Sequence, residues 1–326
     1  MEPRRRNPLT MPAGRVLGVI LIALGIAALF NSAAMVRAGE SMKRGNTRDM
    51  VLSVAHPLDD FAGAVGLHLP RDGLDKAFGQ ESKTGESRLQ SGSTAILRAN
   101  RRKQRQQTIF QPTPQHEVNL FVTGDSEAQF VGEVLTDMLP SNLFDVSVIA
   151  RNATGLTNPE FFNWDINARQ EIAARKPDAV VMVIGGNDGF NVAVNGQVYG
   201  PDTPQWQLEY ARRTAVVMQE LGSNGKRPVY WVPPPTARDT EFNKIYETEN
   251  KAVEQAARAV PGARYVDIYS TLNHGRYSDV LKIDGRKVLA RQPDGIHFSR
   301  AGAVAPARLI LRAMAKDYKV LGDAAN

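Results

Sequence analysis

The chain has 326 residues, of which 42% are hydrophobic and 23% charged, so it is long enough for one large folded domain with additional segments. The absence of cysteine excludes disulfides and thiolate metal sites, and the five scattered histidines argue against a zinc site. The formal charge of +6 is concentrated in residues 1–15 and 81–116, so the sequence predicts no nucleic-acid-binding face on the folded part.

The N-terminal segment has the charge pattern of a membrane-targeting sequence. Arginines in residues 1–15 precede an apolar run over residues 16–36. A membrane-spanning helix needs about 20 apolar residues, whereas a cleaved signal peptide has a shorter apolar stretch. We expect a cytoplasmic basic tail at 1–15 and a transmembrane anchor at 16–36, with a signal segment as the alternative. Because arginines stay in the cytoplasm, this predicts a single-pass inner-membrane protein with its remainder in the periplasm, or a secreted or periplasmic protein after cleavage.

Residues 37–116 are predicted to form a spacer. Apolar residues recur at helical spacing over residues 51–78, where Pro57 and Pro70 divide the pattern into two short amphipathic helices. Such helices can dock on the folded domain or on a membrane surface. Residues 79–116 are rich in Gln, Arg, Ser, Thr and Gly, which predicts a disordered basic linker.

From residue 117 onward, expected strands alternate with expected helices. The strands are predicted at 118–123, 146–150, 179–184, 228–232 and 265–268, and the helices at 127–139, 166–175, 204–221, 241–259 and 299–316. This alternation is typical of a parallel sheet with helices on both sides. The prediction is an α/β domain over 117–318, a three-layer α/β/α (flavodoxin-like) fold with a five-stranded parallel sheet, followed by a tail at 319–326. Ligands of such sheets bind at the carboxyl ends of the strands.

Two motifs at this edge have the residues of a nucleophile and its base. Gly124-Asp125-Ser126 follows the first strand, where glycine permits a sharp turn and the serine begins a helix whose free N–H groups favour negative charge. The same tripeptide also fits an ordinary turn with a helix N-cap. In Asp294-Gly295-Ile296-His297, the aspartate can orient the imidazole so that its other nitrogen accepts a serine proton. A surface histidine near a helix start is the alternative.

Two further motifs at the same edge can supply N–H donors. Thr154-Gly155 follows the second strand, and a glycine there lets its own N–H approach a substrate oxygen. Gly185-Gly186-Asn187-Asp188 follows the third strand, where two glycines clear space for the Asn187 amide. Asn-Asp after a strand is also common turn chemistry.

In this order, the four motifs resemble those of the SGNH (GDSL-like) hydrolase superfamily. The serine, glycine, asparagine and histidine that name the superfamily match Ser126, Gly155, Asn187 and His297, and the resemblance covers about residues 117–318. It implies a serine ester hydrolase in which Ser126 is the nucleophile, His297 its base and Asp294 the group that orients the histidine. The oxyanion would be held by the N–H groups of Ser126 and Gly155 and by the Asn187 side chain, with no metal or cofactor.

The sequence departs from the common pattern at Glu127, where the superfamily has leucine. A carboxylate there favours the helix N-terminus, and it adds a negative charge near the site that discourages anionic substrates. The Gly-Asp-Ser-Glu opening, residues 151–156 and the spacer resemble a poorly characterised, membrane-anchored bacterial branch of the superfamily.

Placement outside the cytoplasm favours an O-acetyl group on a cell-envelope or secreted polysaccharide as the substrate. Trp206 and Tyr210 lie one helical turn apart, and an aromatic ring can stack on a sugar, so both are candidate substrate-binding residues together with Asp188. Ordinary helix packing is the alternative for the two aromatic residues. Further aromatic candidates follow Gly155, namely Phe161, Phe162 and Trp164.

Other functions stay open at this stage. The same serine intermediate serves an O-acyltransferase that passes the acyl group to a glycan hydroxyl, and a membrane-associated chain also suits a lipase or lysophospholipase. A catalytically silent, envelope-binding scaffold is the non-enzymatic alternative. The expected partners are an acylated glycan or other ester substrate and the membrane, but no nucleic acid, and the oligomeric state is left open.

Overall fold

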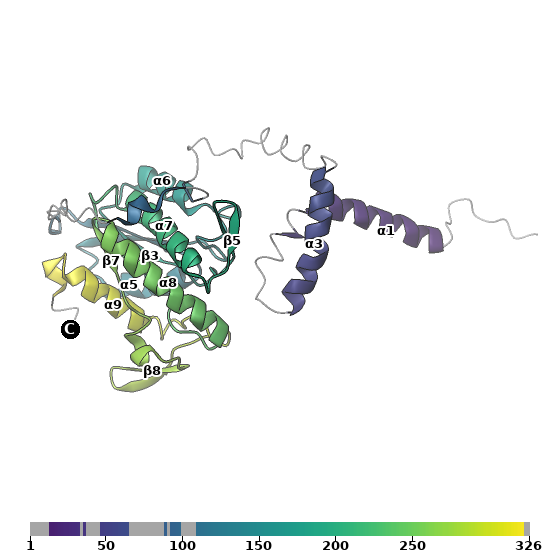
Figure 1. Cartoon of the computed structure of the whole chain (residues 1–326). Helices are drawn as coiled ribbons and strands as arrows, with labels where there is room; N and C mark the ends of the chain where they lie inside the picture. Colours follow the sequence, from purple (N-terminus) through teal and green to yellow (C-terminus); the bar gives the residue numbers. More distant parts are fainter. Residues whose placement is uncertain are drawn as a thin grey trace, which may run out of the picture. The chain divides into compact units, whose positions relative to one another are not determined.

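A computed structural model describes residues 13–32, 35–36, 46–64, 88–89, 92–98 and 109–322 (Figure 1). The chain divides into two compact units, Met1–Lys83 (unit 1) and Thr84–Asn326 (unit 2), and each is described by itself.

Unit 1 contains the helices α1 (Ala13–Phe30) and α3 (Asn46–Ala64). The hydroxyl of Ser32 donates to the Asp59 carboxylate at 2.9 Å, which ties the segment after α1 to α3. Pro57 lies inside α3, although the sequence predicted that it would divide two helices. A proline removes only one i→i−4 hydrogen bond, at a cost of about 3 kcal/mol, and here the flanking turns continue the helix. Residues 65–78, the second half of the predicted pair, lie outside the described residues.

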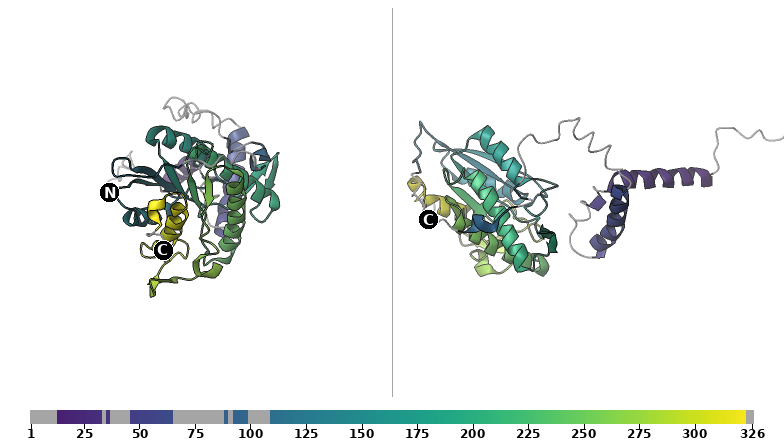
Figure 2. Two further views of the ribbon diagram at one scale, coloured as in Figure 1. Left: turned by 90° about the vertical axis from the view of Figure 1, so that its left-hand side faces the viewer. Right: turned by 45° about the horizontal axis from the view of Figure 1, so that its top comes forward.

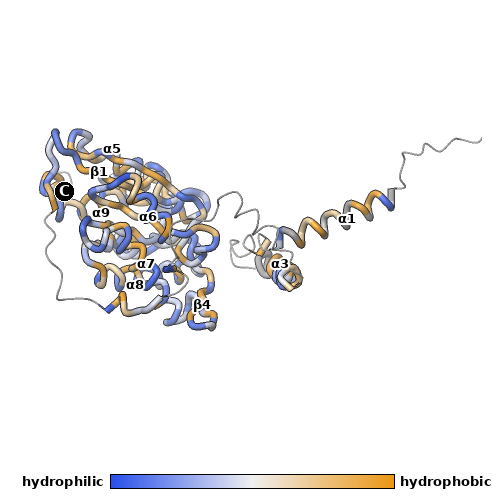
Figure 3. Tube along the Cα trace, turned by 90° about the horizontal axis from the view of Figure 1, so that it is seen from above, coloured by the Kyte–Doolittle hydropathy of each residue, from blue (hydrophilic) through white to orange (hydrophobic). Residues whose placement is uncertain are grey.

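The apolar segment near the N-terminus forms the helix α1, which is 18 residues long and mostly hydrophobic (Figure 3). In the part of the chain that the structure describes, no helix combines the length and the apolar character needed to cross a membrane. The predicted spanning helix over residues 16–36 is not found among these residues.

The main sheet of unit 2 has five parallel strands in the order β2-β1-β3-β6-β7. These strands are β1 (Val118–Gly124), β2 (Phe144–Ala150), β3 (Ala179–Val183), β6 (Val229–Val232) and β7 (Ala263–Tyr265). The order reverses direction between β1 and β3, as in flavodoxin-like folds, and the crevice at this switch point is the usual ligand site. The predicted α/β fold with a five-stranded parallel sheet is confirmed.

Helices cover both faces of this sheet (Figures 1 and 2). One face packs against α5 (Glu127–Met138) and α9 (Val304–Ala315), and the other packs against α6 (Trp164–Arg175), α7 (Pro204–Leu221) and α8 (Thr240–Ala259). Because strand side chains alternate, Leu120 and Val122 belong to the first core whereas Phe121 belongs to the second. The central strand β3 is buried at every position, as its continuous apolar sequence predicted.

Two antiparallel hairpins that the sequence analysis did not predict extend from the sheet edge. They are β4 (Val192–Val194) with β5 (Gln197–Tyr199), and β8 (Val280–Ile283) with β9 (Arg286–Leu289). Both turns are two residues long, Asn195-Gly196 and Asp284-Gly285, and all four residues have positive φ. Asn-Gly and Asp-Gly are the strongest short hairpin signals, so the information was present in the sequence.

Short 3₁₀ helices complete the structure: η1 (Thr94–Leu97), η2 (Leu272–Gly275) and η3 (Lys319–Leu321). Leu321 is fully buried in the core beside α9, so the folded unit extends beyond the predicted end at residue 318. The last long helix begins at Val304 rather than 299, because residues 300–303 form turns.

Residues 88–89 and 92–98, here called the strap, pack on unit 2 instead of belonging to a disordered linker. Leu89 is fully buried in the core with α6, α7 and α8. The backbone N–H and the guanidinium of Arg88 donate to Asp165 at 2.8 and 2.9 Å. The linker prediction for 79–116 is therefore wrong for the strap, because averaged composition does not reveal a single leucine that reaches the core.

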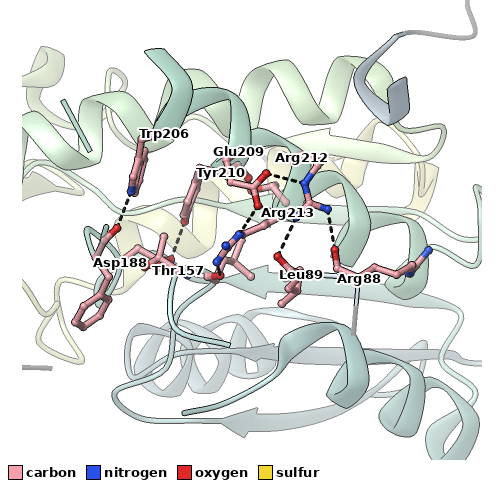
Figure 4. Close-up of polar contacts among 12 residues, drawn as sticks. Arg88, Leu89, Thr157, Asp188, Trp206, Glu209, Tyr210, Arg212 and Arg213 are labelled. Carbon is pink, nitrogen blue, oxygen red and sulfur yellow. Dashed lines mark hydrogen bonds and ion pairs between the residues drawn. The ribbon is translucent and has the colours of Figure 1, made fainter. Parts of the chain in front are cut away.

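The strap also completes a buried charge network on α7 (Figure 4). Arg212 donates to the backbone carbonyls of Arg88 and Leu89 at 2.7 and 2.9 Å, and it pairs with Glu209 at 2.7 Å. Glu209 also accepts from Arg213, whose guanidinium donates to the carbonyl of Leu156 at 2.9 Å. Buried charges are stable only when they are paired and hydrogen-bonded, so the strap carbonyls are part of the folded unit.

Leu89→Ala is expected to lower the free energy of unfolding of unit 2 by about 2–5 kcal/mol, because it removes a fully buried side chain from the core. The control is Leu208→Ala, at an exposed position of α7, which should cost less than about 1 kcal/mol. Urea denaturation of residues 84–326, followed by tryptophan fluorescence, measures both. Equal effects of the two substitutions would contradict a structural role for the strap.

Candidate active site

The residues predicted as nucleophile, base and orienting acid lie in one hydrogen-bonded chain. The hydroxyl of Ser126 is 2.7 Å from His297 Nε2, and His297 Nδ1 is 2.6 Å from Asp294 Oδ2. Ser126 directly precedes α5, but its side chain makes no capping hydrogen bond. The structure therefore differs from the N-cap alternative, because the hydroxyl faces the imidazole instead of the helix backbone.

Asp294 is fixed by its own turn. Its Oδ1 accepts from the backbone N–H groups of Ile296 and His297 at 2.9 and 3.0 Å, which leaves Oδ2 for the imidazole. Partial burial raises the pKa of Asp294, but the donors of Ile296 and His297 outweigh it and hold the pKa below 3.8. Burial lowers the pKa of His297, but Glu127 and Asp294 outweigh it and hold the pKa above 6.5. Asp294 is thus an ionised partner that favours the protonated imidazole.

The turn after β1 and the loop after β3 are joined through Asp125. This carboxylate is fully buried, and it accepts from the backbone N–H groups of Glu127, Gly185 and Gly186 at 2.9, 3.0 and 2.9 Å. Burial raises the pKa of Asp125 to about 6, against the opposing effect of these donors. Gly124 is required for the close approach, because a Cβ there would lie 1.7 Å from the carbonyl oxygen of Val183.

Of the predicted N–H donors, the Asn187 amide lies against the Thr154–Gly155 peptide. The Asn187 amide donates to the carbonyl of Thr154 at 3.3 Å, so its second hydrogen can serve another acceptor. Within residues 109–322, neither the backbone N–H of Ser126 nor that of Gly155 has a hydrogen-bond acceptor. Unpaired donors at the edge of the sheet can hold a developing oxyanion.

Asp188, Trp206 and Tyr210 do not line a substrate site, and this part of the prediction is wrong. Trp206 and Tyr210 are fully buried, and their rings stack on each other with centroids 4.9 Å apart. The Asp188 carboxylate accepts from the backbone N–H and hydroxyl of Thr157, both at 2.7 Å, and from the Tyr210 hydroxyl at 2.9 Å (Figure 4). Helical spacing alone does not show whether two aromatic residues pack in the core or stack on a sugar.

Asp188 instead supports the loop that carries Gly155. A Cβ on Gly155 would lie 2.5 Å from Asp188 Oδ1, so only glycine fits between this carboxylate and the site. Trp164 is also buried and donates to the Thr154 hydroxyl at 3.2 Å. Of the aromatic residues after Gly155, Phe161 is 54% exposed and stays available for substrate contact.

Residues 119–313, more than half of the chain, match a family model described as "Protein of unknown function (DUF459)". The chain belongs to the DUF459 family. No curated protein matches its sequence significantly.

Solved structures give weak likenesses to this DUF459 chain. The catalytic domain of peptidoglycan O-acetyltransferase A from Streptococcus pneumoniae is 17% identical, with 62% of this chain and 94% of that chain covered and a TM-score of 0.40. A family 3 carbohydrate esterase from Clostridium thermocellum is 15% identical, with 64% and 100% covered and a TM-score of 0.41. An acetyl xylan esterase is 13% identical, with 59% and 98% covered and a TM-score of 0.40. Likeness at this level carries no argument about activity, which rests on the geometry above.

Glu249 of α8 is a buried carboxyl beside the site that the sequence analysis missed. It is fully buried, and neither carboxyl oxygen has a hydrogen-bond partner among the described residues. A Cβ on Gly185 would lie 2.6 Å from Glu249 Oε2, which places this carboxyl behind the loop after β3. Burial raises the pKa of Glu249 well above 4.5, and the charges of Asp188 and Asp125 raise it further. Its position on the apolar stripe of α8, beside Tyr246, is the feature of the sequence that could have predicted its burial.

In the described part of the chain, no group of three or more acidic or histidine side chains is placed to hold a metal ion.

Glu249→Gln should change the pH dependence of unit 2 stability. The folded protein keeps the proton of Glu249 at pH values above the ordinary pKa of 4.5. The contribution of this protonated carboxyl to the free energy of unfolding is therefore complete below pH 4.5, and it is lost as the pH rises toward the raised pKa of the folded state. Glutamine has no such proton, so the variant should gain stability relative to wild type by about 1.4 kcal/mol per pH unit in this window. Urea denaturation at several pH values measures this. Glu247→Gln, at a half-exposed position of α8, is the control, and equal slopes for all three proteins would contradict a buried neutral Glu249.

Proposed function

We propose that this protein is a serine ester hydrolase of the SGNH type, in which Ser126, His297 and Asp294 act as the catalytic triad. The single observation that carries the proposal is the continuous chain of short contacts, 2.7 Å from the serine hydroxyl to the imidazole and 2.6 Å from the imidazole to the carboxylate. These residues come from the end of β1 and from the loop before α9, so their meeting is a product of the fold.

The geometry supports acyl transfer through a covalent intermediate. Ser126 Oγ attacks the ester carbonyl carbon while its proton passes to His297 Nε2, and Asp294 stabilises the resulting imidazolium through Nδ1–H. The carbonyl oxygen becomes an oxyanion, which the N–H groups of Ser126 and Gly155 and the Asn187 amide would hold. Collapse of the tetrahedral intermediate expels the alcohol, which takes the proton from His297. Water then attacks the acyl-serine in the same way and releases the acid.

The exposure of the triad favours an ester of a large alcohol. The side chains of His297 and Asp294 are 32% and 43% exposed, so a polymer can approach them. Together with the location outside the cytoplasm proposed below, this exposure supports our proposal of an O-acetyl group on a cell-envelope or secreted polysaccharide as the substrate, with Phe161 as a candidate contact for the glycan.

Ser126→Ala should remove nearly all hydrolysis of a short-chain aryl ester, because it removes the hydroxyl that is paired with His297 and that forms the proposed acyl intermediate. Asn187→Ala should lower kcat by about 10²–10³, the usual effect of losing one oxyanion donor. The control is Ser141→Ala, an exposed loop serine after α5, which should keep wild-type activity. Ester hydrolysis that persists in Ser126→Ala would refute the assignment.

The same assay separates the alternatives when its substrates are varied. Acetylated glycans, long-chain aryl esters and lysophospholipids distinguish a carbohydrate esterase from a lipase. Addition of a glycan acceptor with an acetyl donor detects O-acyl transfer in place of hydrolysis. A folded protein that hydrolyses no ester and does not react with a fluorophosphonate probe at Ser126 would favour the scaffold function.

We further propose that unit 2 acts outside the cytoplasm. Support comes from the arginines that precede the apolar helix α1, since basic residues before an apolar segment stay on the cytoplasmic side. Protease added to intact spheroplasts is expected to digest unit 2, as detected with an antibody against residues 117–318. Digestion only after lysis would contradict this location.

A further inference from the structure

Glu127 is the first residue of α5 and a carboxyl that the proposed triad does not use. Its side chain is buried, at 6% exposure, directly beside Ser126 in the sequence. Its Oε2 accepts from the backbone N–H of Phe298, the residue after His297, at 3.3 Å. Its Oε1 is also buried and has no hydrogen-bond partner within the described residues. The contact joins the helix of the nucleophile to the loop of the base.

Charged and titratable groups face Glu127 from every element around it. They are His297 and Arg291 on the loop before α9, Asp125 on the turn before α5, and Tyr246 on α8. Burial raises the pKa of Glu127 to about 7, while His297 and Arg291 oppose this rise and Asp125 adds to it. Glu127 therefore changes its charge in the pH range where an imidazole also does.

Arg291 binds the loop that carries His297. It is buried, its guanidinium donates to the carbonyls of Ile296 and Thr236 at 2.6 and 3.1 Å, and it lies 4.0 Å from the centre of the Phe298 ring. The loop on both sides of His297 is thus held by one arginine and one glutamate. The leucine that the superfamily has at position 127 could neither accept from Phe298 nor carry a charge.

We propose that Glu127 is a positioning residue, which holds the His297 loop against α5 and sets, through its charge, the pH range in which His297 accepts the proton of Ser126. The effect on rate rests on the proposed function. The effect on the imidazole does not, because it can be measured in the folded protein without substrate.

The direction of the effect follows from electrostatics. An ionised Glu127 favours the protonated imidazole and raises the pKa of His297. A general base must be neutral, so wild-type activity should rise with pH only as His297 loses its proton. Removal of the charge should let the imidazole become neutral at lower pH.

Two substitutions separate the hydrogen bond from the charge. Glu127→Gln keeps an oxygen that can accept from Phe298 but carries no charge, so the acid limb of kcat/KM should move to lower pH by about one unit. Glu127→Leu removes both the acceptor and the charge. It should therefore also lower kcat/KM at every pH by about tenfold, because the buried Phe298 N–H loses its acceptor. Glu133→Gln, on the same helix with its carboxylate paired to Arg300, is the control and should leave the profile unchanged.

The imidazole itself is followed by NMR of the histidine ring in the full-length protein, where His297→Asn identifies the signal among the five histidines. The expected result is a lower pKa of His297 in Glu127→Gln than in wild type. An identical titration in both proteins would overturn the proposal, and so would wild-type activity of Glu127→Leu across the pH range. If wild type hydrolyses no ester while Glu127→Gln still shifts the titration, the proposed function fails and the role of Glu127 stands.

Discussion

The close packing of β1 against β3 is the constraint on which the rest of the site depends. Gly124 touches the backbone of Val183, and the buried Asp125 carboxylate binds N–H groups of both the turn after β1 and the loop after β3. These contacts fix the starting point of α5 relative to the Asn187 loop. Since the two strands are parallel neighbours where the sheet order reverses, the turn with Ser126 and the loop with Asn187 follow adjacent strands at the same edge of the sheet.

Burial divides the carboxyl groups of the site into two kinds. Asp294 is partly exposed and ionised, so it can stabilise a charged imidazole. Asp125, Asp188 and Glu249 lie in the interior, where burial raises their pKa values. Asp125 and Asp188 have backbone donors that hold the loops, whereas Glu249 has no hydrogen-bond partner within the described residues. Burial thus separates one partly exposed carboxylate, which can pair with the imidazole, from interior carboxyl groups whose pKa values are raised.

The strap extends this support to the other side of the site. The carbonyls of Arg88 and Leu89 satisfy Arg212, Glu209 bridges Arg212 and Arg213, and Arg213 holds the carbonyl next to Gly155 (Figure 4). A chain of buried ion pairs therefore connects a segment before the sheet to the loop that carries Gly155. The part of the folded unit that the structure describes therefore includes Arg88 and Leu89, which precede the predicted start at residue 117.

The sequence by itself determined the succession of strands and helices along the chain and the parallel type of the sheet, because hydrophobic periodicity is local and each strand or helix carries its own pattern. It also placed Ser126 and His297 at strand ends and loops where the fold brings them together. Only the tertiary structure decided that Trp206 is core, that Leu89 belongs to the folded unit and that Glu127 contacts the His297 loop. Burial depends on which distant segments meet at a side chain, and that information is not contained in the spacing of residues along one helix.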